Sequence, residues 1–131
     1  MKATSLDGFI NSILGENTTL KGIYMIKGPL RIDGHFYGKI ESTGKVIIGK
    51  SGRAESTIIA KNVIIGGTIK GDVYSEDKVL ILKTGEIIGN IYSCAITMED
   101  GVIFNGKCKI LNKDNMRDLI DKKKKEKFAI S

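Results

Sequence analysis

The stretch VIIGGTIKGDVYSEDKVLIL, residues 63–82, decides how the chain must fold. Apolar residues stand at alternate positions, as in a β-strand with one buried face, but glycines interrupt them where glycine weakens an ordinary sheet. The apolar positions are Val63, Ile65, Ile69, Val73, Val79 and Ile81, and the glycines are Gly66, Gly67 and Gly71. Strands so short and so regularly broken are typical of a repeat, and the neighbouring sequence should then show the same pattern.

The pattern does recur, in steps of 16 or 17 residues. One column of apolar residues comprises Leu30, Val46, Val63, Val79 and Ile96, and another, two places later, comprises Ile32, Ile48, Ile65, Ile81 and Met98. A glycine follows in every unit and marks a tight corner, because glycine accepts a positive φ; these are Gly34, Gly52, Gly67, Gly85 and Gly101. A second short strand of the form apolar-x-glycine-x-apolar comes next, except that Ser56 replaces the glycine in the unit 54–58.

Each repeat is therefore one coil that cannot bury its apolar face alone. Coils stacked ~4.8 Å apart would pair their backbones and align the apolar columns, so the sequence predicts an all-β fold, a parallel β-solenoid of about six coils of 16–18 residues. A β-sandwich shows the same alternation but needs no constant period. With 41% hydrophobic residues, eight aromatics and no Trp, the core should consist of Ile, Val and Leu.

Charge, cysteines and targeting signals narrow the class of protein. Of the net charge of +6, half lies in residues 112–131, and the rest is too diffuse to predict a nucleic-acid partner. Cys94 and Cys108 lack metal-ligand spacing, which favours free thiols in a reducing compartment. There is no signal-peptide pattern and no apolar run approaching ~18 residues, so we expect a cytoplasmic protein without a metal or cofactor.

Several runs also resemble bactofilins, the polymer-forming cytoskeletal proteins of bacteria. They are LRIDGHFYGKI (30–40), VIIGKSG (46–52), the repeated IKGDV and IIGNI, and GVIFNGKCKI (101–110). The resemblance covers residues 17–110. It implies a right-handed β-helix that assembles into nonpolar filaments without nucleotide. It further implies a scaffold at the inner face of the cytoplasmic membrane, which affects cell shape or localises cell-envelope proteins that the sequence does not identify.

Polymerisation also follows from the repeat itself. A solenoid leaves unpaired N–H and C=O groups at both ends, and no capping sequence follows Ile110. Phe104 belongs to the last coil, in the column of Phe36, Ala54, Ile69 and Ile87, and has no later coil to pack against. We therefore predict a polymerisation interface formed by Phe104, Val102, Cys108 and Ile110 at one end and by Leu20 and Ile23 at the other.

An enzyme is the alternative. Fragments such as Ile48-Gly49 resemble the hexapeptide motif of left-handed β-helix acyltransferases, but that fold needs an unbroken six-residue beat with 18 residues per turn. His35, the one histidine, stands in a corner beside Gly34 and is a weak candidate for a general base. No nucleophile constellation and no phosphate-binding loop is present, so we expect no catalytic residues.

The flanks complete the domain division. In the N-terminal tail, residues 1–16, the spacing of Leu6, Phe9, Ile10, Ile13 and Leu14 predicts a short amphipathic helix that either covers the first coil or contacts the membrane. Residues 17–111 form the expected β-helix domain. Residues 112–131 are expected to be a basic, disordered tail, in which Met116, Leu119 and Ile120 support one turn of helix at most.

Overall fold

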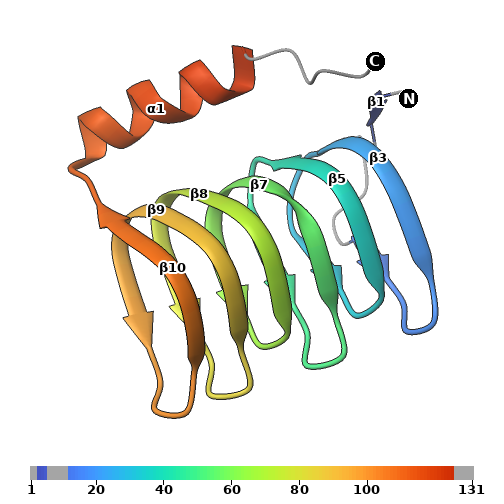
Figure 1. Cartoon of the computed structure of the whole chain (residues 1–131). Helices are drawn as coiled ribbons and strands as arrows, with labels where there is room; N and C mark the ends of the chain where they lie inside the picture. The colour runs from blue at the N-terminus through green and yellow to red at the C-terminus, as the bar shows by residue number, and fades with distance from the viewer. Residues whose placement is uncertain (1–2, 6–11, 126–131) are drawn as a thin grey trace.

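The computed structural model describes residues 3–5 and 12–125, which wind into a coil of short parallel strands with one helix along its flank (Figure 1). The first strands are β1 (Ala3–Ser5), β2 (Ser12–Leu14), β3 (Thr19–Ile26), β4 (Leu30–Ile32) and β5 (His35–Ser42). They are followed by β6 (Lys45–Ile48), β7 (Arg53–Ile65), β8 (Thr68–Ile81), β9 (Glu86–Met98), β10 (Ile103–Ile110) and helix α1 (Lys113–Lys125). The predicted parallel β-solenoid is confirmed.

The strands stack in two columns. The long column is β3, β5, β7, β8, β9 and β10, each paired in parallel with the next. The short column is β2, β4 and β6, continued by the C-terminal ends of β7, β8 and β9, which turn the corner without ending. From the first strand of the long column to the last, the chain makes about five turns.

The register reproduces the columns read from the sequence. Leu30 pairs with Val46, Val46 with Val63, Val63 with Val79, and Val79 with Ile96. The side chains of Val46, Val63 and Val79 are at most 1% exposed, because each has a coil above and a coil below. The interior is thus filled mainly by stacked aliphatic side chains, as the composition predicts.

Five of the six strands of the long column carry a glycine with a positive φ where they bend: Gly22, Gly38, Gly71, Gly89 and Gly106. Gly38 and Gly71 have φ values of 129° and 138°, and a Cβ on either would strike the main-chain oxygen of the coil before it, that of Gly22 or Ser56. Ser56 occupies the same column without a positive φ. Its side chain is buried, and its Oγ has no hydrogen-bond partner among the described residues.

The N-terminal flank differs from the prediction in part. Residues 6–11 of the expected helix lie outside the described residues, but Ser12–Leu14 form strand β2, which pairs with Leu30–Ile32. Leu14 is buried in the core and therefore unavailable to a membrane. The solenoid begins at Ser12 rather than at residue 17, because this segment supplies the first strand of the short column.

The C-terminal flank also differs. Lys113–Lys125 form α1, which runs back along the solenoid from the β10 end instead of being disordered (Figure 1). Met116 and Ile120 are buried against Ile59 and Tyr74, whose side chains point out of the solenoid. Asn112 stabilises the first turn, because its Oδ1 accepts a hydrogen bond from the Asn115 N–H at 2.8 Å.

Candidate assembly interface

Strand β10 is an open edge at the C-terminal end of the solenoid. It pairs with β9 on one side, and no strand of the described residues pairs with its other side. The outward N–H and C=O groups of β10 can therefore accept another strand. Because α1 turns back along the flank, the helix leaves this end uncovered (Figure 1).

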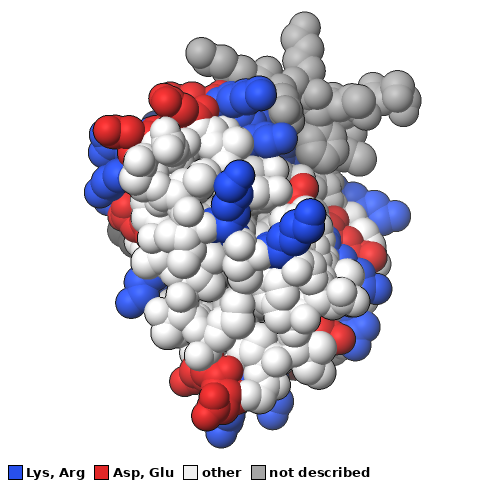
Figure 2. Space-filling view, turned by 60° about the vertical axis from the view of Figure 1, so that its left-hand side comes forward, with Lys and Arg blue, Asp and Glu red and all other residues white. Residues whose placement is uncertain are grey.

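The side chains at this end are mostly uncharged. Val102 and Phe104 are half-buried and pack on the core, whereas Met98, Ile103 and Ile110 are 42%, 61% and 64% exposed. Figure 2, turned so that this end comes forward, shows a broad uncharged surface in which basic side chains stand, with acidic groups toward the edges. A surface of this kind is suited to contact with another protein.

The C-terminal residues predicted for the interface lie together at this end. Phe104 pairs in register with Ile87, Cys108 with Ile91, and Ile110 with Ser93. Cys108 thus continues an interior column but is exposed, because no coil follows. Desolvation raises the pKa of its thiol.

Sequence reasoning missed two exposed apolar residues here. Met98 was identified as a column member, but its exposure at the last coil was not considered. Ile103 stands in the outward row that contains Arg53 and Glu86. An isoleucine in a row that elsewhere carries charged residues could have indicated an exposed apolar side chain at this end.

The N-terminal end is different. Leu20, in register with Phe36, packs partly buried against the core, and Ile23 is in register with Lys39. Strand β1 pairs with Ile23–Met25 on the edge opposite β5, so part of this edge is occupied. The two ends of the solenoid therefore differ: the β10 edge is open, whereas β1 covers part of the β3 edge.

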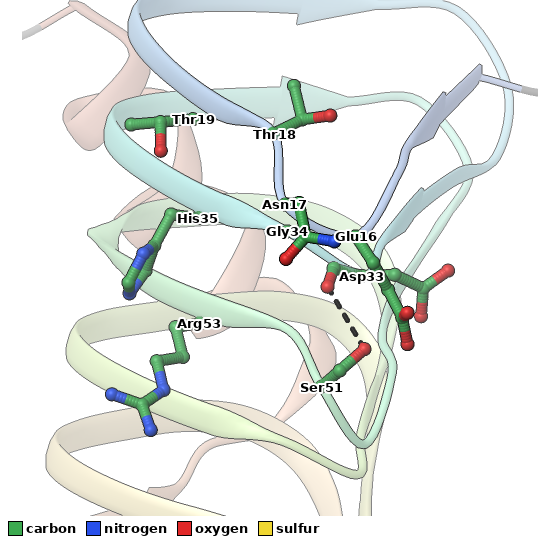
Figure 3. A pocket seen from close by; sticks show the side chains of 9 residues that line it. All are labelled: Glu16, Asn17, Thr18, Thr19, Asp33, Gly34, His35, Ser51 and Arg53. Atoms are coloured by element: carbon green, nitrogen blue, oxygen red, sulfur yellow. Dashed lines mark hydrogen bonds between the residues drawn. The ribbon is translucent and has the colours of Figure 1, made fainter.

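The only histidine lines an open hollow at a corner of the first coils (Figure 3). Arg53 lies beside His35, while the carboxylate of Asp33 points away from it. That carboxylate accepts a hydrogen bond from Arg31 Nε at 2.9 Å, and Ser51 Oγ donates to the main-chain oxygen of Asp33 at 3.0 Å. The hollow thus presents polar groups at a corner, and in the described part of the chain no carboxylate pairs with the imidazole.

Two further observations bear on an acyltransferase or metal site. Successive partners in one row are 18 and then 15 residues apart, His35 to Arg53 and Arg53 to Thr68, which breaks the constant beat of a hexapeptide fold. Within residues 3–5 and 12–125, no three His, Cys, Asp or Glu side chains gather as a metal site would require.

Among the helices of this same part, none is long and apolar enough to cross a membrane.

The flank under α1 is aromatic. The rings of Tyr74 and Tyr92 stack with centroids 4.9 Å apart, and Lys123 Nζ lies 5.6 Å from the centre of the Tyr74 ring. The pKa of Tyr74 is raised, chiefly by desolvation and also by the nearby Asp72. This stripe is already occupied by the helix and is not part of the open end.

Comparison with known proteins agrees with this geometry. The family model described as "Bactofilin: Polymer-forming cytoskeletal" matches residues 12–109. This chain belongs to the bactofilin family. It is 29% identical over 96 residues to Bactofilin BacO of Myxococcus xanthus, covering 73% of this chain and 76% of BacO.

A second relative is longer. Bactofilin BacP of the same organism is 23% identical over 97 residues, which cover 74% of this chain but 40% of BacP. No solved structure matches. The matched segment runs from the first residue of β2 to one residue before the end of β10, and so covers almost the whole solenoid.

Proposed function

We propose that this bactofilin is a scaffold subunit whose solenoids join end to end into nucleotide-independent, nonpolar filaments near the cytoplasmic membrane. The observation that carries the proposal is the open β10 edge beside the exposed side chains of Ile103 and Ile110. A twofold contact would pair two β10 strands antiparallel and cover the half-buried Phe104 in both subunits. A second contact, through Leu20 and Ile23, would then continue the filament.

The free energies expected for such a joint favour association by a modest amount. Strand β10 has eight residues, so a symmetric pairing forms several hydrogen bonds, each contributing ~1 kcal/mol net. Burial of apolar side chains adds ~25 cal/mol per Å². Association costs ~4–15 kcal/mol, so a single contact is of modest strength and assembly should depend on concentration.

Membrane proximity is the second part of the proposal. It rests on Leu6, Phe9 and Ile10, which lie outside the described residues, and on Ile13 in β2. Since Leu14 is a core residue, the anchor can be tested by the double substitution Phe9→Glu, Ile10→Glu rather than by deletion of residues 1–15. The variant should stay folded and polymerise, but float less with anionic vesicles than the wild type.

Negative-stain electron microscopy of the purified full chain without nucleotide tests filament formation. We expect filaments, and single subunits at every concentration and salt would contradict the proposal. Cys108 then locates the joint, because its thiol is exposed in the free subunit. Labelling with a maleimide should be slower in filaments than in subunits dispersed by dilution, whereas equal rates would place the joint elsewhere.

A further inference from the structure

The outer surface of the short column carries an aliphatic row. Ile47, Ile64 and Leu80 are in register on β6, β7 and β8. Their neighbours along each strand are core residues, at most 1% exposed: Val46, Ile48, Val63, Ile65, Val79 and Ile81. Alternation therefore turns the row outward, and none of the three belongs to either buried cluster. We call this surface, with the corners beside it, the short-strand face.

Lysines border this row on both sides. Lys45 and Lys78 stand two places before Ile47 and Leu80 and are in register with Asn62 between them, and Lys61 precedes Asn62. Lys50 and Lys83 stand at the opposite corners. All five side chains are exposed, and in the described part of the chain no carboxylate pairs with them.

Three carboxylates near these lysines are paired with other cations. Asp77 pairs with Lys113 at 3.5 Å, and Glu76 pairs with Arg117 at 3.6 Å, so α1 removes two negative charges beside Lys78. Asp33 pairs with Arg31 at 2.9 Å. At the last corner, Glu99 Oε1 accepts a hydrogen bond from the Lys83 main-chain N–H at 2.9 Å, and Asp100 is exposed. A carboxylate thus lies beside Lys83, which confines the basic surface to the middle coils.

Between Lys45 and Lys78 lies a hollow of about 270 Å³, lined also by Asn62, Val63, Ile64 and Leu80. The two lysines are two strands apart, about 10 Å between their backbones, which leaves room for a phosphate group between the two ammonium groups. The aliphatic side of the hollow suits the less polar part of the same ligand.

We propose that the short-strand face binds the surface of an anionic phospholipid leaflet, with headgroup phosphates at Lys45 and Lys78 and Ile64 and Leu80 against the interfacial layer. The arrangement fits a plane, because the row runs along the solenoid axis and cations stand on both of its sides. This site deepens the proposed membrane location. It lies on every subunit, away from the β10 end, and does not depend on polymerisation. Its outward row continues through Arg31 to Ile13 of β2.

The test compares matched variants of the full chain. Lys45→Gln with Lys78→Gln removes two charges from the short-strand face. Arg53→Gln with Lys70→Gln removes two from another face of neighbouring coils, where both side chains are also exposed. Binding is measured by flotation with phosphatidylcholine vesicles that contain phosphatidylglycerol, and with pure phosphatidylcholine vesicles.

We expect the Lys45, Lys78 variant to lower the partition coefficient for the anionic vesicles about 30-fold, which corresponds to ~1 kcal/mol per lysine. The control should change it only slightly, and binding to pure phosphatidylcholine should be weak throughout. The loss should persist in the Phe9→Glu, Ile10→Glu background, since the two lysines remain on the solenoid when those apolar side chains are replaced.

Two results would overturn the inference. An equal loss in the control shows a net-charge effect without a specific face. Unchanged binding of the Lys45, Lys78 variant shows that the face does not meet lipid, and leaves an acidic protein as its partner. Micrographs of the same samples separate this site from filament formation, since vesicle binding can be lost while filaments persist, and filaments can fail while vesicle binding stays lysine-dependent.

Discussion

Lys39 Nζ donates a hydrogen bond to the main-chain oxygen of Lys123, 84 residues further along the chain, at 3.2 Å. Lys39 is 5% exposed, and its ammonium group also lies 3.5 Å from the Glu41 carboxylate. A cation is thus held at the C-terminal end of α1, where unpaired carbonyls concentrate negative potential. The contact fastens the far end of the helix to the early coils.

Replacing Lys39 by alanine should therefore loosen the last turn of α1. Loss of a hydrogen bond from a charged donor costs ~1.5–3 kcal/mol when both groups are buried, so we expect a decrease of about 1–2 kcal/mol in the free energy of unfolding. Hydrogen exchange of the amides in residues 120–125 should accelerate. Lys70→Ala, which removes an exposed lysine, is the control, and equal exchange in both variants would contradict the role given to Lys39.

The attachment of α1 to the solenoid depends on Met116, a residue of the helix whose side chain is fully buried. Met116→Ala should cost about 2 kcal/mol or more, because it leaves a cavity against Ile59 and Tyr74. We expect tyrosine fluorescence to change in urea before the strand signal in circular dichroism, since the helix separates first. Asp118→Ala, on the exposed side of α1, is the control and should unfold in urea in a single transition by both measurements. A single transition for Met116→Ala as well would mean that helix and solenoid unfold together.

Two buried serines should respond in opposite directions to the same substitution. Ser56 Oγ has no hydrogen-bond partner in the part of the chain that the structure describes, so Ser56→Ala should be neutral or stabilise by up to about 1 kcal/mol. Ser75 Oγ lies 2.9 Å from the main-chain oxygens of both Lys61 and Lys78, so Ser75→Ala should destabilise by about 1–2 kcal/mol. Urea unfolding measures both, and a loss at Ser56 as large as that at Ser75 would indicate a bound water at Ser56.

The repeat could be predicted because the strand register of a solenoid is visible in its sequence as a regular spacing of core residues. Each core column recurs at a nearly constant interval, so Val46, Val63 and Val79 could be aligned without coordinates, and even the exception at Ser56 fell in the right column. The open end followed equally directly, since the pattern stops after Ile110.

The helix position could not be predicted in the same way. Met116 and Ile120 have helical spacing, but their partners Ile59 and Tyr74 are outward-facing residues of two different coils. These partners become neighbours only when the coils stack, so the apolar surface that receives the helix cannot be recognised in the sequence. Strand β2 was missed for another reason. Ile13 and Leu14 fit a helical pattern and a strand equally well, and only the pairing of β2 with β4 distinguishes the two.

The last prediction compares two members of one column, Phe104 and Ile87, which are paired in register on β10 and β9. Ile87 has a coil on each side and is fully buried, while Phe104 has a coil on one side and is half-buried. An arginine at Ile87 would bury an unpaired charge, so Ile87→Arg should unfold the last coils and lose much of the strand signal in circular dichroism.

Phe104→Arg should act differently, because the guanidinium can reach solvent in the free subunit. In a symmetric joint, however, it places two like charges against each other and removes the aromatic contact. We expect a soluble variant with a wild-type strand signal that forms short oligomers, measured by light scattering and electron microscopy. Long filaments of Phe104→Arg would show that the joint does not involve β10. If Phe104→Arg instead loses as much of the strand signal in circular dichroism as Ile87→Arg, Phe104 is a core residue, and one flanking coil is enough to bury its ring.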